Sequence, residues 1–305
     1  MFSNILVVVD SSRAVHPELG RALTLARLSQ GSLHIVDVVR DLTWLGKLFQ
    51  QGAADAQSKA IQQRQAILDQ LVAECAQQQV TATAEVLVGT SSQQIIAQAQ
   101  KMKADLVIRY AKGQHSHSES KLGATAQLLI RWPPCPLWLH RAQHEPIKRI
   151  VAAVDATPDD RQHAAINKQI LKTASELAGH HQADLKIVYV WTMYGDHLLK
   201  HHMPMAEYQR LVDYSRKEHV DSFARLLTDN QIAAQAGELL EGDASTIVPR
   251  YCAENQVDLL VCGTVARQGV PGLVLGNTVE RIMNLVDCSI LAMPLSKQQS
   301  DSSVG

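Results

Sequence analysis

The chain lacks a hydrophobic run long enough to cross a membrane. Its longest apolar runs are about five residues, such as residues 150–154, whereas a transmembrane helix needs roughly 18 or more. The first ten residues contain no basic segment, and Asp10 and Arg13 end the apolar run near the start, so we predict no secretory signal peptide. We therefore expect a cytoplasmic protein that is not inserted into a membrane.

The sequence also lacks an excess of one charge. It has 29 Lys and Arg against 30 Asp and Glu, and its formal net charge is -1. A protein without a positive field is a poor partner for a phosphate backbone, so nucleic acid is not expected as a main partner. With 46% hydrophobic and 19% charged residues over 305 positions, the composition is typical of globular proteins and the length predicts about two domains.

Cysteine is scarce, and no pair of cysteines has metal-ligand spacing. The five cysteines are odd in number and form no C-x-x-C motif; they are Cys75, Cys135, Cys252, Cys262 and Cys288. This usage favours reduced thiols over a disulfide framework or a zinc site.

Two common nucleotide-binding motifs are absent. There is no Gly-x4-Gly-Lys-Ser/Thr motif, and Asp10, Ser11 and Ser12 stand where a dinucleotide-binding glycine motif would follow the first strand. These absences exclude the P-loop NTPases and the dinucleotide-dependent dehydrogenases.

The chain consists of two copies of one unit. Residues 105–108 match residues 258–261, and the same offset of 153 relates Gly89, Gly123, Thr125 and Cys135 to Gly242, Gly276, Thr278 and Cys288. The first strands, at residues 5–10 and 150–155, are related by a smaller offset of 145 residues. The second copy therefore carries about eight extra residues, mostly between its first two strands. We expect domains at 1–143 and 144–297, followed by a disordered polar tail at 298–305.

Short Val, Ile and Leu runs alternate with segments of helical period in each copy. In the first copy the pattern predicts strands near 4–9, 33–39, 82–88, 105–109 and 136–140, and helices near 17–30, 54–79, 91–103 and 122–131. This order predicts an α/β fold of two tandem doubly wound domains, each a five-stranded parallel sheet flanked by helices. Ligands of such sheets bind beyond the carboxyl ends of the strands, where Asp10 and Asp155 are expected.

A glycine-rich segment follows the fourth strand of the second copy. Residues 262–278 include four glycines and lead into a helix near Val279. Glycine allows close approach of the backbone, and a helix start offers free N–H groups, so the segment suits a phosphate. Asn277 and Thr278 are equally suitable as helix N-caps.

This segment resembles the phosphate loop of the universal stress protein family, whose ATP-binding members carry Gly-x2-Gly-x9-Gly-Ser/Thr. The second copy reads Gly263-x2-Ala266-x9-Gly276-Asn277, and the first reads Tyr110-x2-Gly113-x9-Gly123-Ala124. The resemblance spans nearly the whole chain as two tandem domains. It implies a fold like that of the adenine nucleotide alpha hydrolases. Because family members dimerise through their last strands, it also implies an internal pseudo-dimer that uses residues 136–140 and 289–293, with a homodimer as a further option.

The resemblance implies two sets of binding residues. They are Asp155, Val190, Gly263, Thr264, Gly276, Asn277 and Thr278 in the second copy, and Asp10, Val38, Gly113, Gly123, Ala124 and Thr125 in the first. The implied ligands of the second copy are ATP or AMP with Mg²⁺, and Asp155 is the implied metal ligand. Ala266 and Asn277 weaken this site, whereas Tyr110 and Glu119 oppose a triphosphate in the first copy by bulk and by charge.

Three functions stay open at this point. The first is a stress-response module that senses an adenine nucleotide or another small ligand without meaningful turnover. The second is a slow Mg²⁺-dependent ATPase, and the third is a scaffold or a binder of an apolar ligand in which both pockets have lost nucleotides. Separately, His197 and His201 have the spacing of helical metal ligands, but a solvated loop insertion after Trp191 is the favoured interpretation of that segment.

Overall fold

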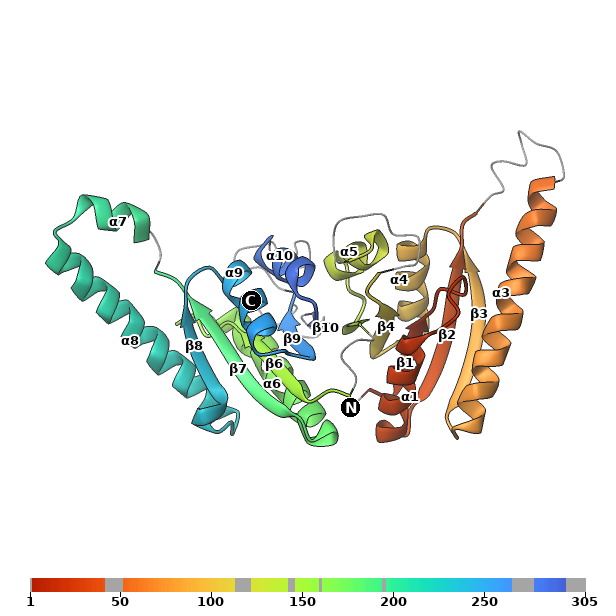
Figure 1. Ribbon diagram of the computed structural model, residues 1–305, viewed down its shortest axis with the longest axis horizontal. Coiled ribbons are helices and arrows are strands. Elements are labelled where there is room, and N and C mark those ends of the chain that lie inside the picture. The colour runs from red at the N-terminus through yellow and green to blue at the C-terminus, as the bar shows by residue number, and fades with distance from the viewer. Residues whose placement is uncertain are drawn as a thin grey trace, which may run out of the picture. The chain divides into compact units, whose positions relative to one another are not determined.

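The computed structural model describes residues 2–41, 52–112, 122–141, 146–158, 161–193, 196–264 and 277–294. Contacts divide the chain into two compact units (Figure 1). Unit 1 comprises residues 1–144 and 289–294, and unit 2 comprises residues 145–288 and 295–305.

Unit 1 contains a mainly parallel sheet with the strand order β3-β2-β1-β4-β5-β10. Its elements are β1 (Asn4–Val8), α1 (Pro17–Ser29), β2 (Ser32–Val39), α3 (Gly52–Gln77), β3 (Thr81–Val88), α4 (Ser91–Lys101), β4 (Leu106–Tyr110), α5 (Ala124–Arg131), β5 (Leu137–His140) and β10 (Ser289–Met293). The central strand β1 is buried from Ile5 to Val8, as expected for a strand covered on both faces.

Unit 2 repeats this plan with the parallel strand order β9-β6-β7-β8. Its elements are β6 (Arg149–Val154), α6 (Arg161–His181), β7 (Asp184–Trp191), α7 (Asp196–His202), α8 (Met205–Asp229), the 3-10 helix η1 (Ala234–Ala236), β8 (Gly237–Glu241), α9 (Ala244–Glu254), β9 (Leu259–Gly263) and α10 (Asn277–Leu285).

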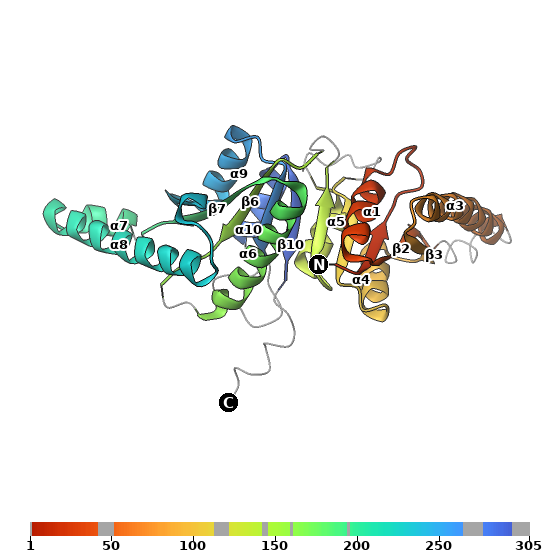
Figure 2. The ribbon, with the colours of Figure 1, turned by 90° about the horizontal axis from the view of Figure 1, so that it is seen from below.

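Helices cover both faces of each sheet. Right-handed crossovers place α1 and α3 on one face of the unit 1 sheet, with α4 and α5 on the other (Figure 2). The same rule places α6 and α8 on one face of the unit 2 sheet and α9 and α10, which contact each other, on the opposite face. The long helices α3 and α8 lie along the outer strands β3 and β8 (Figure 1).

The predicted doubly wound α/β fold is confirmed, and the predicted elements of unit 1 lie within a few residues of the observed ones. The extra residues of the second copy lengthen one helix, since α6 has 21 residues and α1 has 13. The segment after Trp191 was predicted to be a solvated loop, but residues 196–202 form helix α7. Its residues Lys200, His201 and His202 are exposed, so the prediction of a solvated segment is confirmed there. The tail at 298–305 lies outside the described residues.

The last strand of the second repeat pairs with the last strand of the first. β10 is antiparallel to β5, with Ile290 opposite Leu139 and Ala292 opposite Leu137. The backbone N–H of Arg141 donates to Ser289 Oγ over 2.9 Å. Because β10 clusters with unit 1, the sheet of unit 2 retains four of the five strands of its repeat.

Matching glycines turn the chain from an outer strand into a helix in each unit. Gly89 follows β3 with a φ of 141°, and Gly242 follows β8 with a φ of 133°. A side chain is strained at such angles, which glycine adopts readily. The amide of Gly89 donates to Val39 O and that of Gly242 to Trp191 O. These turns direct the amino ends of α4 and α9 to the carboxyl edge of each sheet. Among the described helices, none is both long and apolar enough to span a bilayer.

Candidate functional site

Unit 2 has a cavity of about 370 Å³ at the carboxyl edge of its sheet. The strands β6, β7 and β9 and the helices α6, α9 and α10 contribute its described lining. These residues are Ala153, Val154, Asp155, His163, Ile166, Asn167, Ile170, Val188, Val190, Thr192, Gly242, Asp243, Ala244, Val248, Cys262, Gly263, Thr278, Val279 and Ile282. The cavity lies where ligands of doubly wound sheets bind.

Four of the residues predicted for the second copy line this cavity together. Asp155, Val190, Gly263 and Thr278 all contribute to the wall. Thr264 is buried but is not part of the described lining. Asn277 begins α10, but its side chain and the whole of Gly276 lie outside the described residues.

Asp155 is held in a defined position at the end of β6. Its Oδ1 atom accepts hydrogen bonds from Thr157 N over 3.1 Å and from Thr157 Oγ1 over 2.6 Å. The buried Asn167 side chain donates to Asp155 O over 2.7 Å and accepts from Asp155 N over 3.2 Å. Hydrogen bonds to both its backbone and its carboxylate preorganise this residue at the edge of the cavity.

A polar chain connects Asp155 to helix α8. Thr157 Oγ1 lies 3.5 Å from Tyr189 OH, which lies 2.6 Å from His219 Nδ1. The indole of Trp191 stacks on the His219 ring with 5.0 Å between centroids. The buried Tyr189 hydroxyl therefore has a hydrogen-bonding neighbour on each side, Thr157 and His219.

The other side of the cavity carries a capped helix start. Asp243 is the N-cap of α9, and its carboxylate accepts from Ser245 N over 3.3 Å and from Ser245 Oγ. Hydrogen bonding by Ser245 is the main reason that the pKa of Asp243 lies below its ordinary value. This carboxylate adds a second negative charge to the cavity.

The β9 wall of the cavity is not reactive. Burial raises the pKa of the Cys262 thiol to about 12, so Cys262 stays protonated at neutral pH and is a poor nucleophile. The helices α6, α9 and α10 add apolar side chains to the cavity lining, including Ile166, Val248 and Ile282.

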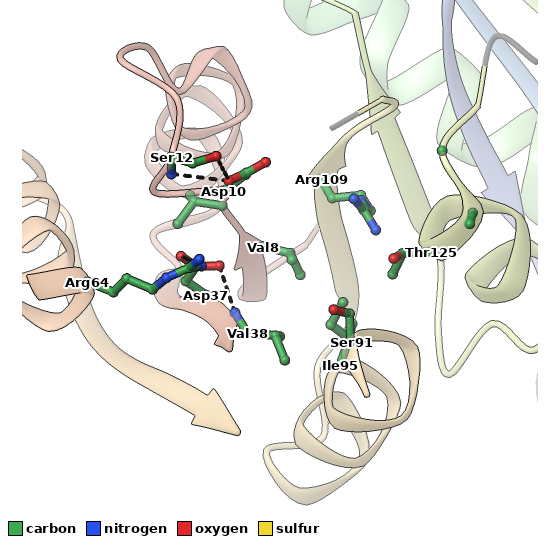
Figure 3. A pocket seen from close by; sticks show the side chains of 13 residues that line it. Val8, Asp10, Ser12, Asp37, Val38, Arg64, Ser91, Ile95, Arg109 and Thr125 are labelled. Atoms are coloured by element: carbon green, nitrogen blue, oxygen red, sulfur yellow. Dashed lines mark hydrogen bonds and ion pairs between the residues drawn. The ribbon is translucent and has the colours of Figure 1, made fainter. Parts of the chain in front are cut away.

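Unit 1 has a cavity of about 380 Å³ at the equivalent edge (Figure 3). Its described lining comprises Val8, Val9, Asp10, Ser12, Asp37, Val38, Arg64, Ser91, Ile95, Arg109, Gly123, Ala124 and Thr125. The lining includes all the binding residues predicted for the first copy except Gly113, which lies outside the described residues together with Glu119.

Four charged residues are part of the described lining of the unit 1 cavity, namely Asp10, Asp37, Arg64 and Arg109. On one side, Arg64 Nη1 donates to Asp37 Oδ2 over 2.7 Å. The same carboxylate accepts from Ser11 N over 3.1 Å, from Ser11 Oγ and from Val38 N over 2.7 Å. Asp10 Oδ1 accepts from Ser12 N over 3.1 Å, in the turn that Asp155 and Thr157 make in unit 2.

Arg109 lies on the other side of the unit 1 cavity, next to Thr125 (Figure 3). Burial lowers the pKa of its guanidinium to about 10, although the nearby charges of Glu18 and Asp10 oppose this shift. The group therefore stays charged at neutral pH. Arg109, Arg64 and Asp37 line this cavity but were not among the residues predicted for it. The signal for Arg109 was its position at the end of an apolar strand, where the offset of 153 places Cys262.

Tyr110 fills the position that glycine holds in the second copy. Its ring lies between two neighbours, with the guanidinium carbon of Arg13 3.7 Å from the ring centroid and the His140 ring at 6.3 Å in an edge-to-face contact. These contacts hold the ring in place.

Among the described residues, no group of three or more His, Cys, Asp and Glu side chains could hold a metal ion. A metal at Asp155 would therefore need ligands from a bound molecule and from water. A Mg²⁺ ion on a nucleotide has this coordination, because it takes one or two protein carboxylates and completes its shell with phosphates and water. The donor set around Asp155 fits such an ion.

Comparison with known proteins adds sequence relatives and structural neighbours. A sequence model of the Universal stress protein family matches residues 1–141 and 146–294. Universal stress protein E of Photorhabdus laumondii is 24% identical over 304 residues, covering 96% of this chain and 95% of the relative. Universal stress protein E of Escherichia coli K12 is 23% identical over 312 residues, covering 98% of this chain and 96% of the relative.

Two solved structures share the fold over nearly the whole chain. A functionally unknown protein from Pseudomonas aeruginosa PAO1 has a TM-score of 0.76 at 21% identity and covers 96% of this chain and 92% of its own. A universal stress protein from Archaeoglobus fulgidus has a TM-score of 0.62 at 13% identity, and the match covers 96% of this chain and 99% of that protein. At these identities the likeness shows the fold alone.

Proposed function

Because the chain belongs to the universal stress protein family, we propose that it is a cytoplasmic stress-response protein whose second unit senses an adenine nucleotide, ATP or AMP. The observation that carries this proposal is the gathering of Asp155, Val190, Gly263 and Thr278 around one cavity. These four residues lie in β7, β9 and α10 and directly after β6, and these elements are far apart in the sequence. Nucleotide binding is thus supported by a pocket whose described lining comes from several elements, as well as by a loop motif.

The cavity provides an environment for each part of a nucleotide. Val190 and the apolar α6 wall suit the adenine ring. Gly263 has no side chain and admits a close ligand, while Thr278 supplies a hydroxyl in the first turn of α10. The positive end of that helix favours the phosphates. When bound, Mg²⁺ would neutralise phosphate charge beside Asp155, whose carboxylate is already oriented by Thr157.

An apolar ligand is the second candidate for this cavity. Its described wall is rich in aliphatic side chains, including Ile166, Ile170 and Ile282. Asp243 also places a carboxylate where a phosphate would otherwise meet the start of α9. These two features favour an apolar ligand over a triphosphate and justify a direct test.

The experiment measures what the purified chain holds and what it binds. Denaturing the protein and analysing the released small molecules by mass spectrometry should recover about one adenine nucleotide per chain. Titration calorimetry with Mg·ATP should then show binding that Gly263→Val abolishes, because the added side chain enters the space of the ligand. Thr278→Val should weaken ATP binding because a lining hydroxyl of the unit 2 cavity is lost, whereas the matching change in unit 1, Thr125→Val, should leave it unchanged.

Three other outcomes would change the assignment. Absence of both ATP and AMP binding at millimolar concentration would contradict the proposal, and recovery of a lipid-like molecule would support the apolar ligand. Mg²⁺-dependent phosphate release that disappears in Asp155→Asn would instead identify a slow ATPase.

A further inference from the structure

We propose that the first turns of α6 are a base-recognition element of unit 2, in which His163 contacts the nucleobase of the ligand and Asn167 positions Asp155. This inference rests on the proposed function, that unit 2 binds an adenine nucleotide, and deepens it by assigning residues outside the glycine-rich segment. Four observations carry it: an extension of α6, a buried helix face, an apolar part of the cavity wall and a hydrogen-bonded clamp.

The first observation is that the extra residues of the second repeat fall at the start of α6. Ser32 begins β2 and Asp184 begins β7, which gives an offset of 152 residues. The last residues of α1 and α6 are related by the same offset, which places Pro17, the first residue of α1, level with Gln169. Residues 161–168 therefore extend α6 beyond the length of α1.

The second observation is that one face of α6 is buried against the cavity. Four buried residues of α6 line it, namely His163, Ile166, Asn167 and Ile170. Their spacing of three, four and seven residues places them on one side of a helix. By contrast, the described lining of the unit 1 cavity includes no residue of α1. The extension thus supplies three side chains that are specific to the cavity of unit 2.

The third observation is that aliphatic side chains of α6 and β7 line the same cavity. Ile166 and Ile170 lie one helical turn apart on α6, which packs against β7. Val188 and Val190 are two residues apart in β7 and therefore share one face of the sheet. Aliphatic surface of this kind suits a planar ring better than a phosphate chain. We assign the nucleobase to this part of the cavity.

His163 adds a polar ring to this part of the wall. It precedes Ile166 by three residues on the same helix face, and it is only 4% exposed. An imidazole has two nitrogen atoms, so one can interact with the protein while the other bonds to a ligand. The ring nitrogens and the amino group of adenine are suitable partners for such a bond. A polar group set among apolar lining residues is how small-molecule sites commonly fix the orientation of a ligand.

The fourth observation is that Asn167 is already engaged by Asp155. Its Nδ2 atom donates to Asp155 O over 2.7 Å, and its Oδ1 atom accepts from Asp155 N over 3.2 Å. In unit 1, Asp10 O instead accepts from Arg13 N within its own loop. Asn167 therefore fixes the backbone of Asp155 from α6 and acts as a positioning residue, whereas His163 contacts the ligand.

The test titrates matched variants of the full chain with AMP by calorimetry. His163→Leu should weaken AMP binding by about 2- to 12-fold, the effect of losing one neutral hydrogen bond. Lys168→Leu, on the exposed side of the same extension, is the matched control and should bind AMP like the wild type. His163→Gln keeps a hydrogen-bonding side chain and should restore most of the affinity, which a loss of packing alone would not explain.

A second probe, ribose 5-phosphate, separates the base from the rest of the ligand, because it is AMP without the base. His163→Leu should narrow the difference in affinity between AMP and ribose 5-phosphate, since only AMP reaches the base-recognition element. A distorted cavity would instead weaken both probes alike. Hydrogen exchange of β6 and β7 amides checks that each variant is folded.

Asn167→Leu tests the positioning role. This change should lower the gain in ATP affinity that Mg²⁺ provides by about 10-fold, the lower end of the range for groups that orient a metal ligand. AMP titrated without metal gives a second readout and should lose less affinity than Mg·ATP. Equal losses for the two ligands would overturn the positioning role of Asn167.

Two results would overturn base recognition, and they are distinguishable. If the wild type binds AMP and His163→Leu binds it as tightly as Lys168→Leu does, the proposed function stands and the role of His163 is wrong. If the wild type binds neither AMP nor Mg·ATP at millimolar concentration, the proposed function is contradicted and this inference fails with it.

Discussion

The sixth residue of the eight-residue second strand is Asp37 in unit 1 and Tyr189 in unit 2, and both perform the same structural task. Asp37 joins Ser11 to Arg64 of the long helix α3. Tyr189 joins Thr157 to His219 of the long helix α8. In each unit a polar side chain thus links the loop after the first strand to a helix. The comparison teaches that both units build this link from different residues, with a charged side chain in unit 1 and a tyrosine in unit 2.

The same contrast extends to the ends of the fourth strands. Unit 1 has Arg109 and Tyr110 where unit 2 has Cys262 and Gly263. Arg109 therefore adds a charged side chain to the lining of the unit 1 cavity, whereas Cys262 and Gly263 leave the equivalent wall of unit 2 uncharged. The two cavities share matching residues such as Asp10 and Asp155, or Thr125 and Thr278, but differ in charge at the ends of their fourth strands. Two repeats with one backbone plan can therefore present different chemistry to a ligand.

The largest effect in this comparison is expected from Arg64→Met, which leaves the buried Asp37 carboxylate without its cation. Breaking a buried ion pair costs roughly 3 to 5 kcal/mol. Arg64 is partly exposed, so we expect about 3 kcal/mol of lost unfolding free energy. Urea unfolding followed by hydrogen exchange of β1 and β2 amides measures the loss.

A matched variant separates charge from packing at this site. Adding Asp37→Asn to Arg64→Met removes the uncompensated charge and should recover most of the loss, since the Ser11 hydrogen bonds can persist. A double variant as unstable as Arg64→Met alone would show that Arg64 acts through packing rather than through charge.

The backbone plan of each unit was readable from the sequence because apolar periodicity depends on burial alone. The strand near 33–39 was predicted from its Val and Ile content and is observed as Ser32–Val39. The sites at the carboxyl edge were also predicted in part, since Asp10 and Asp155 follow first strands and line the cavities.

The side chains that set the charge of each cavity were not readable from the sequence. Arg64 lies in the middle of a predicted helix, and nothing in the helical period shows that it reaches Asp37 on a strand 27 residues earlier. Likewise, His219 meets Tyr189 only after α8 packs on the sheet. Pairings across elements depend on tertiary packing, which local patterns do not contain.

An intermediate effect is expected from pH, because only unit 1 has a histidine at the end of its last strand. His140 is fully buried, and burial is the main reason that its pKa is lowered from 6.5 to about 4. Between these values the unfolded chain binds a proton that the folded chain rejects, so stability falls as the pH falls. The loss should reach about 2 kcal/mol at pH 5 relative to pH 7.5.

His140→Met copies the residue at the equivalent position of the second repeat, Met293, and should remove this pH dependence. Urea unfolding at pH 7.5 and pH 5 measures it as a difference, so a change in packing that is independent of pH cancels. His202→Asn, in the exposed end of α7, controls for the loss of a histidine from the surface. A pH dependence that survives in His140→Met would assign it to other groups.

The smallest effect is expected from Tyr189→Phe in unit 2, which breaks the neutral link while preserving the ring. A neutral hydrogen bond contributes about 1 kcal/mol, less than the charged link of unit 1, and the ring contacts with Phe223 and His219 remain. Urea unfolding with hydrogen exchange of β6 and β7 amides provides the same measure as for Arg64→Met. Because Thr157 also positions Asp155, the variant should weaken Mg·ATP binding as well. A loss of 3 kcal/mol or more would show that the neutral link matters as much as the charged one and would remove the distinction between the two units.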